Sequence, residues 1–249
     1  MDGAGAIQRG KVWLVGAGPG NPELLTVRAY RLLQSASVVA YDELVTSEVL
    51  AIAPASAERI PVGRRAAGNR HHDARIHPQV IERALQGSDV IRLKGGDPLV
   101  FGRGGEEAEE LARAGLAFEF VPGVSAAMAA AAAMSIALTH RECASSVTLA
   151  TAHAAGAAES GVYGTAREDT LVFYMALGRV EETCADLIAR GRRADTPAAV
   201  VSRASLPDAR IVTGALGDLG ARVREAALQP PALLIVGDVV GRRVMSPAR

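Results

Sequence analysis

The chain has 249 residues, of which 49% are hydrophobic and 22% are charged, and its 27 basic residues balance its 27 acidic residues. This composition excludes an intrinsically disordered chain, and the zero net charge excludes a protein that attracts nucleic acid or an anionic membrane surface by its overall field. The two cysteines, Cys143 and Cys184, have no C-x-x-C spacing, which indicates a reducing cytoplasm rather than a disulfide framework.

The first half of the chain alternates short apolar runs with segments of helical pattern, after an N-terminal stretch that lacks the apolar core of a signal peptide. This alternation is typical of a parallel sheet covered by helices. The expected strands are residues 11–18, 37–42, 57–63 and 89–96, and the expected helices are residues 25–36, 47–54, 77–88 and 106–116.

An alanine-rich run from Ser125 to Leu138 follows, and it is too short to cross a bilayer, so we expect a buried helix there. The alternation then resumes. The expected strands are residues 170–176, 197–205, 209–216 and 231–240, and the expected helices are residues 180–191 and 219–226. The sequence therefore predicts an α/β fold of two domains, residues 11–140 and 141–241, each with a mainly parallel or mixed sheet flanked by helices.

A glycine-rich turn, GAGPG, follows the first expected strand. With Asp42 at the end of the second strand, it suggests a dinucleotide-binding fold, which leaves a nicotinamide-dependent oxidoreductase as one hypothesis. Against this, Asn21 occupies the place of the third glycine, and Pro19 removes an amide donor from the turn. The next helix is expected to begin near Leu24. The turn predicts close packing on the backbone more than pyrophosphate binding.

A second glycine-rich segment, RLKGGDPLVFGRGGEE, follows the strand at 89–96. Open α/β sheets bind ligands at the carboxyl ends of their strands, where glycines let a ligand approach the main chain. Asp97 can accept hydrogen bonds there. We expect Glu106, beside Arg103, to belong to a site, and we interpret Glu107 as a favourable charge at a helix N-terminus.

These segments carry a resemblance to a known family. The strings VGAGPGNPELLT, VVAYDELV, VGRR, RLKGGDPLVFGRGGEE, VPGVSAA, ALTHR, LVFYM and PPALLIVGDVV occur in order across nearly the whole chain, and they resemble the uroporphyrinogen-III C-methyltransferases of the tetrapyrrole methylase class. The resemblance implies a homodimer of two-domain subunits with the ligand cleft between the domains. It implies transfer of two methyl groups from S-adenosylmethionine to carbons 2 and 7 of uroporphyrinogen III. The product would be precorrin-2, a precursor of sirohaem and cobalamin.

The resemblance also implies roles for individual residues. It assigns proton abstraction to Asp42. Arg64 occupies a position where relatives commonly have a lysine, which has been proposed as a proton donor. It implies substrate contacts at Arg103, Glu106, Arg141 and Met175. The implied cofactor contacts fall on small residues, apolar residues or main chain at Pro19, Gly95, Gly96, Asp97, Val100, Ser125, Ala126, Met175, Ala204 and Ala232.

Some features depart from the family pattern or leave alternatives open. A guanidinium stays protonated at any working pH, so Arg64 can pair with a carboxylate but is a poor acid. The histidines at His71, His72 and His77 have no cysteine or carboxylate spacing that completes a zinc site, so no metal is expected. Besides the oxidoreductase, a methylase acting on a later cobalamin precursor and a non-catalytic tetrapyrrole-binding protein stay open.

Overall fold

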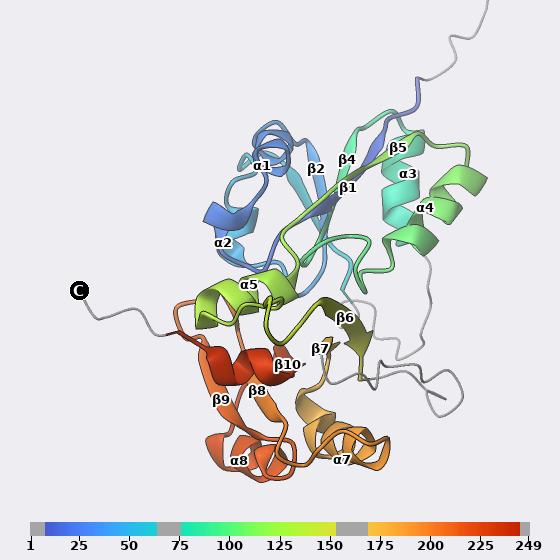
Figure 1. Cartoon of the computed structure of the whole chain (residues 1–249). Coiled ribbons are helices and arrows are strands. Elements are labelled where there is room, and N and C mark those ends of the chain that lie inside the picture. Colours follow the sequence, from blue (N-terminus) through green and yellow to red (C-terminus); the bar gives the residue numbers. More distant parts are fainter. Residues whose placement is uncertain (1–7, 64–75, 153–168, 245–249) are drawn as a thin grey trace, which may run out of the picture. The chain divides into compact units, whose positions relative to one another are not determined.

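The computed structural model describes residues 8–63, 76–152 and 169–244 (Figure 1). The chain divides into two compact units, Met1–Ser125 and Ala126–Arg249. Among the described residues, no helix combines the length and the hydropathy that crossing a membrane requires.

The first unit contains a five-stranded sheet in the order β3-β2-β4-β1-β5, and every neighbouring pair of strands is parallel. Because the strands are parallel, their carboxyl ends meet at one edge, and the loops that follow β1, β2, β4 and β5 come together there. The strands are β1 (Val12–Gly16), β2 (Val38–Tyr41), β3 (Glu58–Pro61), β4 (Val90–Lys94) and β5 (Phe118–Val121).

Helices cover both faces of this sheet, as Figure 1 shows. On one face, Leu33 of α1 and Val49 of α2 pack in a cluster with Val39 of β2. On the other face, Val80 of α3 and Leu111 of α4 pack in a second cluster. Each such buried aliphatic side chain stabilises the fold by about 2 kcal/mol. The helices are α1 (Val27–Gln34), α2 (Ser47–Leu50), α3 (Pro78–Leu85) and α4 (Gly104–Arg113).

The second unit contains a mixed sheet in the order β6-β7-β10-β8-β9, in which β6 and β7 are parallel and the other pairs are antiparallel. The central strand β10 is buried along its whole length. The strands are β6 (Ser146–Thr151), β7 (Asp169–Tyr174), β8 (Pro197–Ser202), β9 (Arg210–Ala215) and β10 (Ala232–Val236). One parallel and one mixed sheet flanked by helices confirm the expected fold class.

Helix α5 (Ala126–Met134) belongs to the second unit. Its buried alanines, Ala127 and Ala130, pack in one cluster with Val172 of β7 and Ile235 of β10, which confirms the buried helix expected from the alanine-rich run. The units therefore divide ahead of α5, between Ser125 and Ala126, whereas the expected boundary between residues 140 and 141 assigned this helix to the first domain. The small alanine side chains let α5 lie close to the second sheet.

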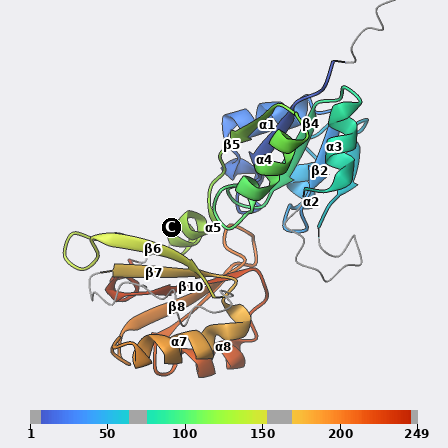
Figure 2. The same ribbon diagram turned by 90° about the vertical axis from the view of Figure 1, so that its right-hand side faces the viewer.

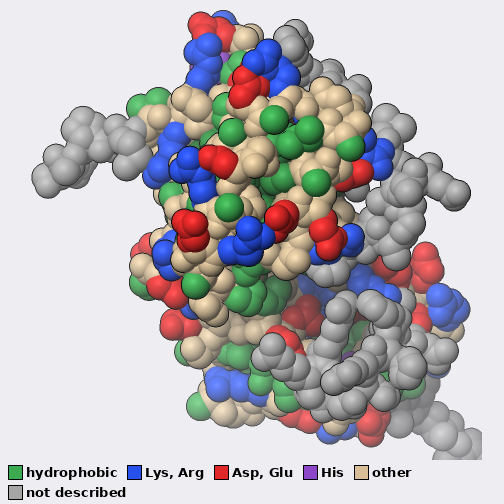
Figure 3. Space-filling view, turned by 90° about the horizontal axis from the view of Figure 1, so that it is seen from below, with side chains coloured by type: hydrophobic (Ala, Val, Ile, Leu, Met, Phe, Trp, Pro, Cys, Tyr) green, Lys and Arg blue, Asp and Glu red, His purple; other side chains and the backbone are tan. Residues whose placement is uncertain are grey.

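Helices α7 (Val180–Ala189) and α8 (Leu219–Ala226) cover the opposite face of the second sheet, as Figure 2 shows. Their outer surfaces carry ion pairs, such as Arg190 with Asp186 at 2.7 Å. In the view of Figure 3, basic and acidic side chains lie next to one another over the described surface. This mixing of signs fits a chain without net charge.

The sequence analysis did not predict two of the strands, β5 in the first sheet and β6 in the second. Both are edge strands. The residues of β5 are only partly buried except Val121, and β6 has one buried residue, Ala150. The edge strands β3 and β9 bury no more residues than these two and were expected, so burial alone does not explain why β5 and β6 were missed.

Candidate active site

The turn after β1 and the loop after β4 are joined by backbone hydrogen bonds. Gly18 N–H donates to the Gly96 carbonyl at 3.1 Å, and Gly96 N–H donates to the Gly18 carbonyl at 2.8 Å. Pro19 therefore lies beside the loop of Gly95–Asp97. The structure thus brings together two segments of the first unit that the sequence predicts to contact a cofactor.

This turn differs from a dinucleotide-binding turn, in which free amides at a helix N-terminus receive a pyrophosphate. The Gly18 amide is already bonded to Gly96, and a short 3-10 helix at Pro22–Leu24 follows. The α-helix begins at Val27 rather than near Leu24, because the Oγ1 of Thr26 caps it by accepting a bond from the amide of the third helical residue at 3.2 Å. The geometry therefore argues against the oxidoreductase hypothesis.

Asp97 fixes the shape of the loop after β4. Its Oδ1 accepts a hydrogen bond from Leu99 N at 2.8 Å, and its Oδ2 accepts one from Gly123 N at 3.0 Å, beyond the end of β5. A carboxylate that accepts two backbone N–H groups holds both loops in place. Ser125, another predicted cofactor residue, lies two positions after the residue that Asp97 binds.

Three glycines let the ends of β1, β4 and β5 approach one another closely. A Cβ at Gly123 would lie 2.2 Å from the carbonyl oxygen of Gly96 and 2.8 Å from the Cα of Gly16. A Cβ at Gly95 would lie 3.1 Å from the Cβ of Leu44. These glycines are therefore required by the close packing of the strand ends. Gly95 and Gly96 are only partly buried, which fits a ligand that is recognised largely through backbone groups.

Two candidate residues and three sequence neighbours of candidates have left-handed backbone conformations, which cost non-glycine residues about 1–3 kcal/mol each and cluster at functional sites. In the first unit, Phe101 and Arg103 have φ of 53° and 60°. In the second unit, Met175 has φ of 55°, and the two neighbours of Ala204 have φ of 52° and 73°. The side chain of Met175 is exposed.

The remaining predicted residues of the second unit lie at the ends of its elements. Ala126 and Ala232 are the first residues of α5 and β10, and Ala232 is buried. Arg141 is exposed in the turn between α5 and β6, where His140 and Ala144 form an isolated bridge. In the first unit, Val100 N–H donates to the carbonyl of the loop aspartate at 3.3 Å. Arg64 lies outside the described residues, as do His71 and His72.

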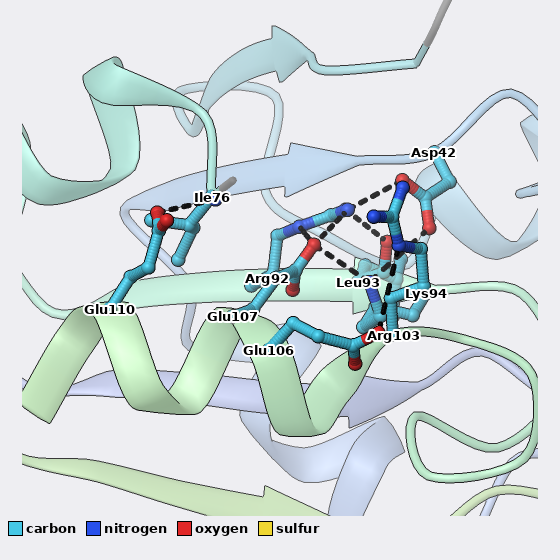
Figure 4. Close-up of polar contacts among 9 residues, drawn as sticks. All are labelled: Asp42, Ile76, Arg92, Leu93, Lys94, Arg103, Glu106, Glu107 and Glu110. Atoms are coloured by element: carbon cyan, nitrogen blue, oxygen red, sulfur yellow. Dashed lines mark hydrogen bonds and ion pairs between the residues drawn. The ribbon is translucent and has the colours of Figure 1, made fainter. Parts of the chain in front are cut away.

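Behind this edge of the first sheet, four charged side chains form a buried cluster, shown in Figure 4. Asp42, directly after β2, accepts a hydrogen bond through Oδ1 from Arg92 Nη2 at 2.6 Å. Glu107 of α4 accepts through Oε1 from the same Arg92 nitrogen and from Lys94 Nζ, both at 2.8 Å. The ammonium of Lys94 also lies 3.9 Å from Oδ2 of Asp42. We call these four residues the charged quartet.

The members of the charged quartet differ in exposure. The side chain of Asp42 is 30% exposed, whereas those of Arg92, Lys94 and Glu107 are 7% exposed or less. Asp42 is therefore the member that a substrate can reach. The two cations and Glu107 lie behind it and act on a ligand only through it.

Burial and charge act in opposite directions on the two cations. Burial lowers the pKa of Arg92, but the charges and hydrogen bonds of Asp42 and Glu107 outweigh it, so the pKa is raised above its usual value. Burial also lowers the pKa of Lys94, and the charge of Arg92 lowers it further, more than the two carboxylates raise it. Lys94 therefore holds its proton less firmly than an exposed lysine does.

The neighbouring pair of Arg103 and Glu106 is more open. Arg103 Nε lies 3.8 Å from Glu106 Oε1, and the side chains are 36% and 52% exposed. Two adjacent glutamates of α4 thus differ, because Glu106 faces outward and Glu107 is buried in the charged quartet. The interpretation of Glu107 as only a favourable charge at a helix N-terminus is incomplete, since its carboxylate binds two buried cations.

Sequence reasoning overlooked three members of the charged quartet, Arg92, Lys94 and Glu107. A signal for them existed, because the run DVIRLKGG places an arginine and a lysine inside a strand with the apolar character of a buried one. Buried cations require buried counter-ions. The residue pattern of the strand alone could not show which carboxylates are the counter-ions.

His77, the residue before α3, provides a test of pH dependence. Burial, and then the charge of Arg92, lower the pKa of His77 below its usual value of 6.5. As pH falls through 6.5, the unfolded chain takes up a proton that folded His77 resists, so the free energy of unfolding decreases. We expect His77→Gln to lose less thermal stability than the wild type between about pH 7.5 and about pH 5.5. Equal losses in calorimetry would contradict this.

Comparison with known proteins identifies the family. A model of the tetrapyrrole (corrin/porphyrin) methylases matches residues 11–220. The chain is a member of the tetrapyrrole methylase family. Among the described residues of this methylase, no group of three or more histidines, cysteines or carboxylates could hold a metal ion.

Curated relatives of this methylase include the sirohaem synthase of Pseudomonas fluorescens strain Pf0-1, 45% identical over 245 residues, which are 98% of this chain and 53% of the relative. Sirohaem synthase 2 of Halorhodospira halophila is 49% identical over 94% of this chain and 48% of the relative. The chain therefore spans about half the length of the curated relatives it matches.

Solved structures give matches of nearly full length. The methylase superposes on the uroporphyrin-III C-methyltransferase from Thermus thermophilus complexed with S-adenosylhomocysteine with a TM-score of 0.77 and 41% identity, covering 96% of this chain and 97% of the other. It superposes on a cobalt precorrin-4 methyltransferase with a TM-score of 0.78 and 29% identity, covering 92% and 95% of the two chains.

Proposed function

We propose that this protein transfers two methyl groups in succession from S-adenosylmethionine to carbons 2 and 7 of uroporphyrinogen III, giving precorrin-2 for the synthesis of sirohaem or cobalamin. The observation that carries the proposal is the 41% identity to a uroporphyrin-III C-methyltransferase complexed with S-adenosylhomocysteine, in a match that covers 97% of that enzyme. The sirohaem synthases among the curated relatives support the same chemistry.

The residues present fit S-adenosylmethionine, which supplies an electrophilic methyl group on a sulfonium sulfur when it is bound. In the first unit, the main chain of Gly95–Asp97 is partly exposed and lies beside Pro19. In the second unit, three of the predicted contacts are alanines, Ala126, Ala204 and Ala232, and the fourth is the apolar Met175. The residues that would hold the cofactor are Pro19, Gly95, Gly96, Asp97, Val100, Ser125, Ala126, Met175, Ala204 and Ala232.

The chain's own residues would position the substrate and move one proton for each methyl group added. When a carbon of the macrocycle gains a methyl group, the ring system becomes positive and must lose a proton. Asp42, partly exposed and held by Arg92 at 2.6 Å, would accept that proton. Arg103 and Arg141 would bind carboxylates of the substrate.

Other residues would support binding. Glu106 would accept hydrogen bonds from pyrrole N–H groups, and Met175 would contact the substrate as well as the cofactor. Arg64 would contribute positive charge without donating a proton, because a guanidinium is not deprotonated at working pH. We further propose that the protein works as a homodimer in the cytoplasm, which sedimentation equilibrium and cell fractionation can test.

The test of the function is incubation of the purified protein with S-adenosylmethionine and uroporphyrinogen III without oxygen, followed by mass spectrometry. We expect a product heavier by two methyl groups. The alternative is a methylase that acts on a later cobalamin precursor, and the 29% identity to a cobalt precorrin-4 methyltransferase supports it. Methylation of cobalt precorrin-4 but not of uroporphyrinogen III would favour this alternative. Methylation of neither would contradict both.

A further inference from the structure

Glu107 has an unusual position among the carboxylates of α4. Its side chain is 7% exposed, and its Oε1 accepts hydrogen bonds from Arg92 Nε at 3.2 Å, from Arg92 Nη2 at 2.8 Å and from Lys94 Nζ at 2.8 Å. Its Oε2 is buried and has no hydrogen-bond partner among the described residues. Glu107 therefore holds two cations with one oxygen.

This arrangement is not one that stability alone favours. A buried carboxylate oxygen without a partner destabilises the folded state, and a buried group of ions is often replaced by apolar residues without loss of stability. Buried unsatisfied polar groups in native proteins call for a specific explanation. The two cations held by Glu107 also face Asp42, the exposed end of the cluster, so we look for the explanation there.

The distances of Lys94 suggest how Glu107 acts. Lys94 Nζ lies 2.8 Å from Glu107 Oε1 but 3.9 Å from Asp42 Oδ2, so its hydrogen bond goes to Glu107. Asp42 is bonded to Arg92 through Oδ1. Oδ2 of Asp42 therefore lies near the ammonium of Lys94 but receives no hydrogen bond from it.

The charges balance only with Glu107 present, since two cations face two carboxylates. Without the charge of Glu107, the two buried cations would have one carboxylate, Asp42, as their counter-ion. Lys94 would then close the gap to Oδ2, because a buried ammonium seeks a charged partner. Both oxygens of Asp42 would be engaged from the inside, and the carboxylate would be drawn away from its exposed side.

We propose that Glu107 is a positioning residue for methyl transfer, which holds Lys94 away from Asp42 so that Oδ2 of Asp42 is open to the proton of the substrate. The inference rests on the proposed function. It assigns no contact between Glu107 and the substrate, because Glu107 is enclosed behind Asp42. The proton passes from the methylated ring to Oδ2 of Asp42, and Glu107 neither gains nor loses one.

The test compares Glu107→Gln, Lys94→Met and the double variant with wild type, at a temperature well below the melting temperature of each. We expect Glu107→Gln to lower kcat about 10- to 100-fold, since misplacing a catalytic group by about 1 Å costs this much. The KM for S-adenosylmethionine should change less than about twofold. Adding Lys94→Met should raise kcat again, because the cation that Glu107 restrains is gone.

A matched control is Glu110→Gln, one turn further along α4. Glu110 is partly buried and accepts a hydrogen bond from Ile76 N at 2.9 Å, but among the described residues its ion pair is with Arg113 and not with either cation of the charged quartet (Figure 4). This variant should keep the kcat of wild type. A Glu107→Gln variant as active as Glu110→Gln would overturn the proposal. A double variant with a lower kcat than Glu107→Gln alone would also overturn it.

Two outcomes separate this proposal from the proposed function. An inactive wild type would overturn both, whereas an active wild type with an equally active Glu107→Gln variant would overturn only the role of Glu107. If Glu107→Gln does not fold, Lys94→Met is compared with the double variant. These two should have the same kcat, because Glu107 has no lysine left to restrain, and a tenfold difference would count against the proposal.

Discussion

The Asp42→Asn variant is expected to lower kcat for methyl transfer by about 100- to 10,000-fold, the usual contribution of a general base. Asparagine keeps the shape of the side chain and can still accept the bond from Arg92, but it cannot take up the proton. The binding of S-adenosylhomocysteine, measured by calorimetry, should stay close to that of wild type, since Asp42 belongs to the predicted catalytic residues and not to the cofactor loop.

The control for this variant is Glu43→Gln, which removes the exposed carboxylate next to Asp42. It should retain kcat within about threefold, as surface substitutions usually disturb little. Asp42→Asn also leaves Arg92 and Lys94 with Glu107 alone, so a lower melting temperature is expected and must be measured beside kcat. Full activity of Asp42→Asn in a folded protein would rule out Asp42 as the base.

The Gly123→Ala variant is expected to destabilise the first unit by about 3 kcal/mol, at the upper end for an overpacked site. The new Cβ would lie 2.2 Å from the carbonyl oxygen of Gly96 and 2.8 Å from the Cα of Gly16, and neither backbone can move without opening the sheet edge. Because whole domains are stable by only about 5–15 kcal/mol, urea denaturation should show a clear shift of the midpoint.

Gly105→Ala provides the matched control. Gly105 lies in α4, and a Cβ there would meet nothing within 4 Å. Alanine favours a helix over glycine by about 1 kcal/mol, so this variant should be as stable as wild type or slightly more stable. If Gly123→Ala unfolded at the same urea concentration as Gly105→Ala, the close approach of the three strand ends would be refuted.

The buried strands could be predicted from sequence because their apolar runs are long and their ends carry glycine. The run 89–96 became β4, and the run 231–240 contains β10. The edge strands β5 and β6 were missed, although the edge strands β3 and β9, which bury no more residues, were expected, so burial does not separate the two pairs. The division into units lies ahead of α5, a place that the sequence did not indicate, because alanines show that α5 is buried but not against which sheet.

The candidate site shows the same division. Local motifs pointed to Asp42 and to the loop of Gly95–Asp97, because strand ends and glycines are visible in a sequence. The pairing of Arg92 and Lys94 with Glu107 depends on which face of α4 meets the sheet, and adjacent glutamates look alike until that face is known. Sequence patterns therefore pointed to residues at the open strand ends, whose roles stay predictions, and did not indicate the buried ion pairs behind them.

The burial of Lys94 also affects how the protein can be handled. The chain has only two lysines, Lys11 and Lys94, and Lys94 is 2% exposed. Amine-directed reagents, such as activated esters on a dye or a resin, therefore react with Lys11 while Lys94 is shielded. The molecule can carry a fluorophore or be immobilised through Lys11 without chemical damage to the residues around Asp42.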